Sequence, residues 1–365
     1  MKTCAIITEY NPFHNGHIYH IKKARELSGA DIIIAIMSGN ISMRGDLSVM
    51  DKFAKTKAAL ENGVDLVVEL PFVHTVQNAS IFAKGAIDIA KRLDVDTLCF
   101  GSETNNLENL KEIADTPIDP DHLKEALKTG ISYPKAYSLL ADSLYPNDIL
   151  AVAYLKELKG SNITPISIQR TNGYHDIELN EIASASAIRK AIKDKKDYHI
   201  ATPSIIDHPV FLSDLYPDIR RHLLLSDPKE LEKIHLVSEG IEKMLVKNAL
   251  KYSKYDDFLS ASVSRRYTRS RIQRILIWIM CGIKEEMLPK ETETYIRILG
   301  FKKETQSYLK ELKERDIKLL TQLKHIPKSY KDIEYRASVF YALAFKEDPF
   351  SEYLLKRELQ GPVIV

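Results

Sequence analysis

Short, strongly apolar runs recur at intervals of about 30 residues through the first half of the chain, a spacing typical of strand-helix-strand units. The runs are rich in β-branched residues and almost continuously apolar, as in strands that helices cover on both faces. This pattern predicts an α/β fold with a parallel sheet. The predicted strands are Thr3–Thr8, Asp31–Met37, Val64–Leu70, Asp96–Phe100 and Ile163–Gln169.

The segments between these runs place apolar residues three and four positions apart, which predicts helices. The predicted helices are Gly16–Leu27, Met50–Asn62, Asn78–Arg92, Asp121–Lys128 and Asn147–Leu158. Beyond residue 200 the strand signals end, and helical patterns punctuated by prolines follow. A chain of 365 residues suits two domains. We therefore predict a sheet domain over residues 1–200 and an α-helical domain over residues 201–365, joined near Tyr198–Pro209.

The composition matches that of soluble globular proteins, with 44% hydrophobic and 28% charged residues. No apolar run is long enough to cross a bilayer, so no membrane association is expected. The start of the chain lacks the pattern of a secretory signal, which makes the cytoplasm the expected location. Cys4, Cys99 and Cys281 lie far apart without metal-ligand spacing, so we expect buried cysteines and no dedicated metal site.

Basic residues are concentrated in the second half of the chain. Residues 1–200 hold 23 Lys and Arg against 26 Asp and Glu, whereas residues 201–365 hold 29 against 24. The segment Ser264–Arg274 reads SRRYTRSRIQR and contains no acid. Guanidinium groups pair with phosphates, and a tyrosine can stack on an unpaired base, which predicts RNA contact. The predicted contacts are Arg265, Arg266, Arg269, Arg271 and Arg274; the alternative is a helix with one buried face and one solvated basic face.

The stretch EYNPFHNGH, Glu9–His17, stands where the first predicted strand turns into the first helix. In an open parallel sheet, ligands bind at the carboxyl ends of strands, and the first turn is the usual phosphate seat. Backbone N–H groups at the helix start attract phosphate, and His14 and His17 can donate hydrogen bonds to its oxygens. Gly16 would let a flat adenine ring lie on the backbone. The alternative is an ordinary turn with partly exposed histidines.

This stretch resembles the H-x-G-H signature of the nucleotidyltransferase and class I aminoacyl-tRNA synthetase superfamily, which reacts at the α-phosphate of ATP. Small members carry a second signature, S-x-[ST]-x-[IV]-R, which Ser184–Arg189 (SASAIR) matches. Hydroxyls of Ser184 and Ser186 at a helix start can hold phosphate oxygens, and Arg189 can neutralise departing pyrophosphate. The alternative is a serine helix cap beside a surface arginine. The resemblance implies a Rossmann-like nucleotidyltransferase sheet.

Further motifs narrow the resemblance to one family, the bacterial tRNA(Met) cytidine acetate ligases, over most of the chain. They are MSGN (Met37–Asn40), RGD (Arg44–Asp46), FGSE (Phe100–Glu103), YPKA (Tyr133–Ala136), PND (Pro146–Asp148), IQR (Ile168–Arg170) and YTRSRIQR (Tyr267–Arg274). The resemblance implies contacts with ATP by the following residues: Ile7, Thr8, Glu9, Tyr10, Asn11, Pro12, Phe13, His14, Asn15, Gly16, His17, Ile18, Tyr19, His20, Gly101, Asn147, Arg170, Ser184 and Ser186. Gly101 as a plain turn residue and Asn147 as a plain helix cap are the alternatives.

Membership of that family implies a ligase that joins acetate to ATP, forming acetyl-adenylate and pyrophosphate. The acetyl group then passes to N4 of the wobble cytidine of elongator tRNA(Met). The resemblance makes His14, His17 and Arg189 the catalytic residues. Mg²⁺ is expected to bridge phosphate oxygens, held mainly by substrate and water.

Two other functions stay open. One is adenylyl transfer to a small phosphorylated molecule at the same ATP site, and the other is RNA binding without catalysis. The polar cluster Arg44, Asp46, Asp51 and Lys52 after the second strand receives no role, since a charged helix start explains it as well. The sequence does not indicate an oligomeric state.

Overall fold

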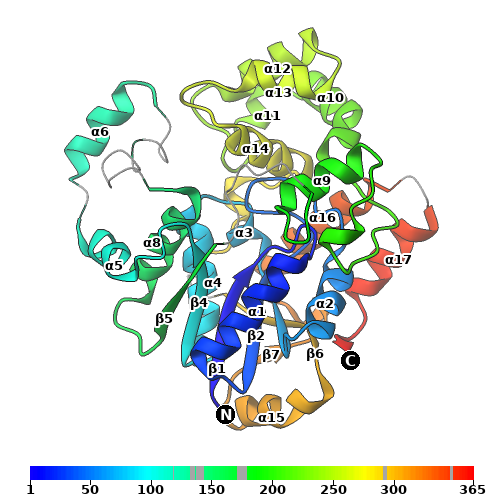
Figure 1. The fold of residues 1–365 in the computed structure, drawn as a ribbon. Coiled ribbons are helices and arrows are strands. Elements are labelled where there is room, and N and C mark those ends of the chain that lie inside the picture. The colour runs from blue at the N-terminus through cyan, green and yellow to red at the C-terminus, as the bar shows by residue number, and fades with distance from the viewer. Residues whose placement is uncertain (118, 132–135, 137–143, 171–178, 291–293, 346–347) are drawn as a thin grey trace.

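The computed structural model describes residues 1–117, 119–131, 136, 144–170, 179–290, 294–345 and 348–365 (Figure 1). Within them, one eight-stranded sheet has the order β5-β4-β1-β2-β3-β6-β7, and β8 pairs with β6. Its strands are β1 (Thr3–Thr8), β2 (Ile32–Ser38), β3 (Leu66–Leu70), β4 (Thr97–Ser102), β5 (Thr164–Gln169), β6 (Ile296–Phe301), β7 (Leu319–Leu320) and β8 (Val363–Ile364). The motif at Tyr133–Ala136 lies largely outside the described residues.

The first five strands are parallel, which confirms the predicted sheet. β1 pairs with β2 on one side, with Thr3 opposite Ile32, and with β4 on the other, with Cys4 opposite Thr97. The chain therefore adds strands first in one direction from β1 and then in the other. In such doubly wound sheets, ligands bind outside the carboxyl ends of the strands where the direction reverses. A ligand site is therefore expected at the carboxyl ends of β1, β4 and β5.

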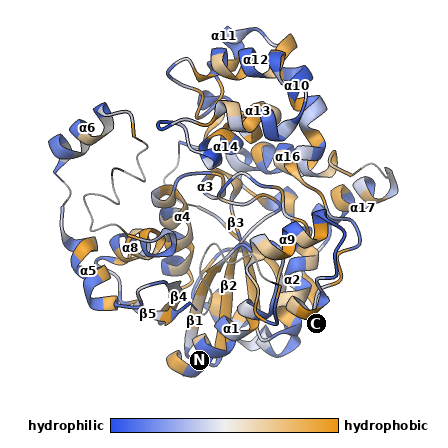
Figure 2. Ribbon diagram, turned by 45° about the horizontal axis from the view of Figure 1, so that its top comes forward, coloured by the Kyte–Doolittle hydropathy of each residue, from blue (hydrophilic) through white to orange (hydrophobic). Residues whose placement is uncertain are grey.

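Helices cover both faces of this sheet because alternate strand residues point to opposite sides. Side chains of α1 (Asn15–Ser28) and α2 (Lys52–Glu61) pack on one face, with Cys4 and Ile6. The opposite face, with Ala5, packs against α4, α5 and α8, and α15 joins this second core. The bounds are α3 (Phe72–Thr75), α4 (Ala79–Arg92), α5 (Leu107–Asp115), α6 (Pro120–Lys128), α8 (Pro146–Leu158), α9 (Ala185–Lys193) and α15 (Gln306–Glu314). Figure 2 shows hydrophobic strands enclosed by helices whose outer surfaces are mainly hydrophilic.

All five predicted helices are present, as α1, α2, α4, α6 and α8, whereas α3 and α5 were not predicted. α9 begins after Ser184, where the SASAIR segment led us to expect a helix start. The three cysteines are buried and free, as expected. Among the described residues, no helix is both long and apolar enough to cross a membrane.

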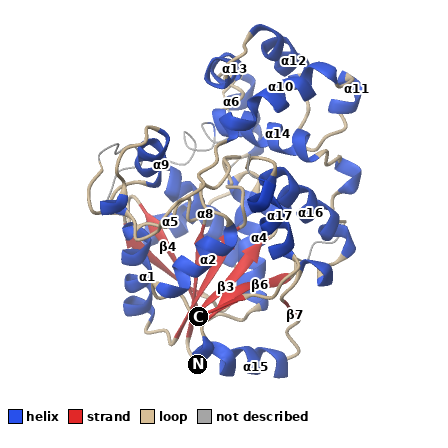
Figure 3. Cartoon of the chain, turned by 90° about the vertical axis from the view of Figure 1, so that its right-hand side faces the viewer, coloured by secondary structure: helices blue, strands red, loops and turns tan. Residues whose placement is uncertain are grey.

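The second half of the chain is mainly helical, as predicted, but the expectation that strands end near residue 200 is wrong. β6 runs antiparallel beside β3, with Leu66 opposite Phe301, and β7 and β8 pair with β6 (Figure 3). β7 and β8 have two residues each, too few to show an alternating pattern. The predicted division at residue 200 stays a prediction.

Apart from α15, the helices of this half form a further core beyond the carboxyl ends of the strands (Figure 1). They are α10 (Tyr216–Leu225), α11 (Pro228–Leu231), α12 (Ile241–Lys251), α13 (Tyr255–Ser262), α14 (Arg269–Cys281), α16 (Lys328–Ala342) and α17 (Asp348–Glu358). Short 3-10 turns lie at His199–Ala201, Leu212–Leu215, Glu285–Met287, Lys303–Thr305 and Leu323–His325. Trp278 of α14 is fully buried, and its indole N–H donates to the Val76 carbonyl at 2.9 Å. This tryptophan is therefore a core residue that joins α14 to the end of α3.

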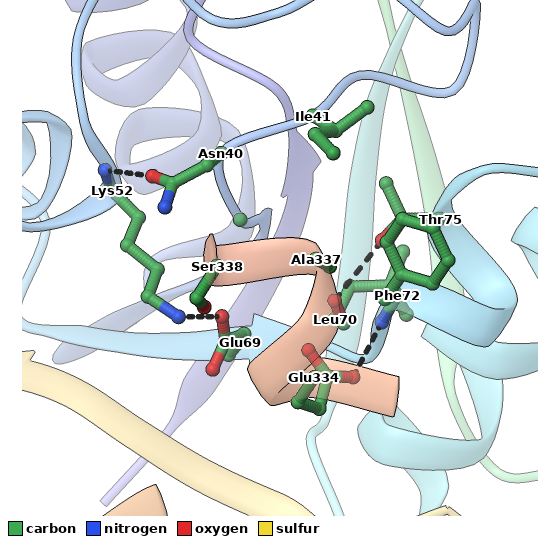
Figure 4. A pocket seen from close by; sticks show the side chains of 11 residues that line it. Asn40, Ile41, Lys52, Glu69, Leu70, Phe72, Thr75, Glu334, Ala337 and Ser338 are labelled. Carbon is green, nitrogen blue, oxygen red and sulfur yellow. Dashed lines mark hydrogen bonds and ion pairs between the residues drawn. The ribbon is translucent and has the colours of Figure 1, made fainter. Parts of the chain in front are cut away.

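A buried ion cluster attaches the end of the chain to the sheet. Lys52 Nζ lies 2.6 Å from Glu69 and 2.7 Å from Glu358. Arg297 contacts the same two carboxylates at 2.8 and 2.9 Å, and all four side chains are at most 2% exposed. Two cations thus balance two anions from α2, β3, β6 and α17. Figure 4 shows Lys52 and Glu69 beside a cavity of about 20 Å³, which Glu334 also lines.

Candidate active site

A cavity of about 310 Å³ opens at the carboxyl ends of β1, β4 and β5. It brings together most of the residues predicted from the sequence, although they come from distant parts of the chain. Those that line it are Ile7, Thr8, Glu9, Tyr10, Asn11, His14, Gly16, His17, Tyr19, His20, Gly101, Asn147, Arg170, Ser184, Ser186 and Arg189. Strand-end position was the sequence signal for many of these residues.

Four residues of the predicted ATP loop do not line the cavity. Phe13 is fully buried against Tyr10, with ring centroids 4.9 Å apart. Asn15 donates from Nδ2 to the carbonyls of Glu181 and Ile200. Pro12 is buried, and Ile18 packs against the core under α1. Their predicted contact with ATP stays a prediction.

The start of α1 fixes both histidine rings. Nδ1 of His14 accepts a hydrogen bond from the Gly16 N–H at 3.1 Å, and Nδ1 of His17 accepts one from the His14 N–H at 3.1 Å. A neutral imidazole that accepts through one nitrogen carries its proton on the other. The Nε2–H of each ring is therefore the donor that remains for a ligand in the cavity.

These imidazoles are neutral near pH 7. Shielding from solvent lowers the pKa of His14 to about 3, and the positive charges of Arg170 and Arg189 add to the effect. Shielding also lowers the pKa of His17 well below its usual value and that of His20 to about 4. Neutral rings can donate to a phosphate oxygen without the mutual repulsion of adjacent cations.

Gly16 has a second reason to lack a side chain. A Cβ at this position would lie 2.9 Å from Cε1 and 3.0 Å from Nδ1 of the His14 ring. Any larger residue would therefore displace the ring that caps the helix. The predicted approach of adenine to this backbone stays a prediction.

The SASAIR segment reaches the first loop through its arginine. Arg189 donates from Nη1 to the Asn11 carbonyl at 2.7 Å and from Nη2 to Ser186 Oγ at 3.2 Å. Ser184 caps α9, since its hydroxyl accepts from the Ala187 N–H at 3.1 Å. The capping alternative thus holds for Ser184, which also lines the cavity. The two signatures, more than 160 residues apart, share one wall.

The loop between β2 and α2, residues 39–51, lines the cavity through Ser42, Met43, Arg44 and Asp46, none of which was assigned to the site. Asp46 accepts a hydrogen bond from Gln273 of α14, and Arg274 donates to the Met43 carbonyl at 3.3 Å. A Cβ on Gly45 would lie 2.5 Å from the Arg274 backbone nitrogen. This β2–α2 loop is therefore in backbone contact with the basic helix.

The other polar residues after β2 are structural. Asp51 caps α2 by accepting from the N–H groups of Phe53 and Ala54, as the helix-start explanation requires. Lys52 belongs to the buried ion cluster. Lys55, which the sequence did not single out, donates to the carbonyls of Glu9, Ser38 and Gly39 and so ties the ends of β1 and β2 together.

One end of the cavity is apolar and aromatic. Phe82, Phe100, Leu150 and Tyr154 line it, and they come from α4, β4 and α8. On the sequence these residues cannot be told apart from ordinary core positions. Arg44, Arg170 and Arg189 also line the cavity, together with the neutral histidines, so the cavity suits a ligand with a flat base and an anionic tail.

No group of three or more metal-ligating side chains occurs among the described residues. The two carboxylates that line the cavity are already engaged: Glu9 accepts from the Met43 N–H at 2.6 Å, and Asp46 accepts from Gln273. Phosphate oxygens and water would have to supply most ligands to a cation in this cavity.

The predicted RNA-contacting arginines lie at and before the start of α14. Arg265, Arg266 and Arg269 are exposed, whereas Arg271 and Arg274 are half-buried. The Arg271 guanidinium lies 4.9 Å from the centroid of the Tyr267 ring, over its face. Tyr267 is the tyrosine that the sequence predicts to stack on an unpaired base. Glu239 contacts Arg266 at 2.6 Å and Arg271 at 3.6 Å. The exposed arginines are thus the ones that a bound RNA could reach first.

Comparison with known proteins agrees with this geometry. The model of the HIGH nucleotidyl transferase family matches residues 1–354. The chain is 37% identical to the tRNA(Met) cytidine acetate ligase of Oceanobacillus iheyensis and 32% identical to that of Bacillus subtilis, over its whole length and at least 97% of theirs. The crystal structure of Thermotoga maritima TmcAL bound with alpha-thio ATP is 31% identical over both full chains, with a TM-score of 0.88. The chain therefore belongs to the HIGH nucleotidyl transferase family and, within it, to the tRNA(Met) cytidine acetate ligases.

Proposed function

We propose that this protein activates acetate with ATP and acetylates N4 of the wobble cytidine of elongator tRNA(Met). The observation that carries the proposal is the meeting of the H-N-G-H and SASAIR segments in one cavity at the strand ends. Relatives that match along their full length are named tRNA(Met) cytidine acetate ligase, and a solved neighbour was crystallised with an ATP analogue.

In the first step, an acetate oxygen attacks the α-phosphorus of ATP, and the bond to pyrophosphate breaks. Acetate is already ionised at pH 7, so the site has to position the reactants and neutralise charge rather than remove a proton. The Nε2–H groups of His14 and His17 donate to phosphate oxygens, and Arg189 offsets the charge of the departing pyrophosphate. The hydrogen bond from Arg189 to the Asn11 carbonyl keeps the guanidinium beside the loop that follows β1.

In the second step, the cytidine N4 attacks the acetyl carbonyl, AMP leaves with the electrons of the broken anhydride bond, and the amine loses one proton to water. The mixed anhydride is reactive enough that no covalent acyl-enzyme is required. A Mg²⁺ ion, held mainly by substrate and water, would supply neutralising charge to the phosphates. The Gly16 N–H is already bonded to His14, so the ring donors and the arginines are the protein's main contribution.

The decisive experiment supplies ATP, Mg²⁺ and labelled acetate with either elongator or initiator tRNA(Met), then digests the RNA. We expect labelled N4-acetylcytidine in the elongator tRNA alone, together with acetate-dependent exchange of pyrophosphate into ATP. A stable adenylated product of a small phosphorylated molecule, formed without tRNA, would instead identify an adenylyltransferase. Binding of tRNA without any exchange would identify an RNA-binding protein without catalysis.

We propose that the exposed arginines before α14 hold the tRNA. We also propose that the reaction takes place in the cytoplasm, where the tRNA substrate is found. Replacing Arg265 and Arg266 together by Ala should weaken tRNA binding about 5- to 10-fold and leave pyrophosphate exchange unchanged. If each arginine meets one phosphate, the slope of log K against log salt should fall by about 1.4 in magnitude. Filter binding at several salt concentrations measures both quantities.

Arg315→Ala serves as the control, because this exposed arginine follows α15 at the opposite end of the molecule and pairs with Asp94. An unchanged salt slope in the double variant would remove these arginines from the RNA-contacting surface.

A further inference from the structure

Asn147 at the start of α8 lines the cavity, and a neighbouring carboxylate controls its side chain. Glu103 accepts hydrogen bonds from the Asn147 side-chain Nδ2 at 2.6 Å, from the Asn147 backbone N–H at 3.1 Å and from the Asp148 N–H at 3.1 Å. An ionised carboxylate has no proton to donate, so only the NH₂ end of the amide can face it. This contact assigns the orientation of the Asn147 amide.

Glu103 itself is held on both sides of its backbone. Its N–H donates to the fully buried Asp148 at 3.1 Å, and its carbonyl accepts from Gln169 Nε2 at 2.7 Å. The turn after β4 is thus locked against both α8 and the end of β5. Because the Glu103 backbone is held in this way, its carboxylate can keep the Asn147 amide in one orientation whichever ligand is bound.

The amide oxygen of Asn147 points away from Glu103, since oxygen and nitrogen lie on opposite sides of the amide carbon. Glu103 does not line the cavity, whereas Asn147 does. Among the described residues, none donates a hydrogen bond to Asn147 Oδ1. The oxygen is therefore an unused acceptor next to the apolar end formed by Phe100, Leu150 and Tyr154.

We infer that Glu103 is a specificity-determining positioning residue, which presents Asn147 Oδ1 to the exocyclic amine of adenine and so selects ATP over nucleotides with a 6-oxo base. This inference rests on the proposed ATP site. The 6-amino group of adenine donates to the oxygen, while the 6-oxo group of hypoxanthine would set two acceptors against each other. A buried acceptor left facing another acceptor lowers affinity more than a missing contact does.

The test is the replacement Glu103→Gln. In this variant the new side-chain oxygen can still accept from the backbone N–H groups of α8, but its NH₂ can donate to Asn147 Oδ1. The Asn147 amide can then turn its own NH₂ toward the cavity, where it would suit a 6-oxo base. Glu108→Gln is the matched control, because Glu108 is exposed in the first turn of α5 and is not one of the residues that line the cavity.

Binding of ATP, ITP and purine riboside triphosphate, which lacks a 6-substituent, is measured by calorimetry without acetate or tRNA. We expect the wild-type protein and the control to bind ATP at least about 10-fold more tightly than ITP, with the unsubstituted purine between them. The Glu103→Gln variant should shift the ratio of ATP to ITP affinity at least about 10-fold toward ITP. The variant Asn147→Ala should bring the two affinities together.

Equal weakening of ATP and ITP in Glu103→Gln would show that Glu103 only caps α8, and equal wild-type affinities would show that Asn147 does not read the amine. Either result overturns the inference while leaving acetate activation, measured separately by pyrophosphate exchange, untouched. Loss of all nucleotide binding in the wild-type protein would overturn the ATP site along with the inference. Thermal unfolding of each variant establishes that it is folded.

Discussion

Replacing His17 by Asn should lower the rate of acetate-dependent pyrophosphate exchange about 10²- to 10³-fold, the loss expected when one preorganised donor to a developing anion is removed. The Asn side-chain oxygen falls near the position of Nδ1, so it can still accept from the His14 N–H and preserve the helix start. Only the donor at Nε2 is lost. Initial rates of exchange at saturating ATP and acetate measure the effect.

His222→Asn, at an exposed position on α10, is the control for the substitution itself. Because the pKa of His17 lies well below its usual value, the neutral ring is the working form over pH 6 to 8, and the wild-type exchange rate should not rise on acidification in this range. A His17→Asn variant within threefold of the wild-type rate, or a wild-type rate that increases as the pH falls, would contradict the role assigned to the neutral ring.

Replacing Lys52 by Met should lower the free energy of unfolding by about 3 to 5 kcal/mol, the usual cost of breaking a buried ion pair from one side. The substitution leaves Glu69 and Glu358 with Arg297 as their only cation in the cluster. One buried negative charge then lacks compensation. Urea unfolding monitored by circular dichroism measures the difference.

Lys57→Met on the same helix is the control, because Lys57 is 64% exposed and lies 3.8 Å from Glu61, so its loss should cost less than about 1 kcal/mol. Burial alone would raise the pKa of Glu358, but Lys52 and Arg297 outweigh it and lower the pKa to about 2. This contribution to stability is complete above pH 4.5 and is lost as the pH falls toward 2. Equal destabilisation by the two Lys→Met changes would argue against the cluster.

The parallel part of the sheet was predictable because its strands are buried on both faces and form continuous apolar runs. β6 escaped prediction for a physical reason: Arg297 interrupts its apolar pattern, and only the tertiary contacts with Glu69 and Glu358 neutralise that charge. From the sequence alone, a charged residue at this position argues against a buried strand.

The candidate site was predictable where chemistry follows the ends of strands, as for His14, Gly101 and Arg170. Phe82 and Tyr154 were missed because apolar residues at helical spacing do not reveal whether they face a core or a cavity. For Arg274 the sequence indicates a positive charge but does not show how deeply the side chain is buried. In the fold, burial lowers the pKa of this arginine to about 10, and its guanidinium contacts the Met43 carbonyl.

The backbone contact between Gly45 and α14 has a consequence for how the RNA must behave. The β2–α2 loop is also held from the other side, where Asn11 bonds to Leu47 and Val49. These contacts on both sides of the loop set the distance between the start of α14 and the cavity. The travel needed to bring an amine to an activated acyl group falls on the nucleic acid, whose cytidine has to swing out of its stack and reach inward.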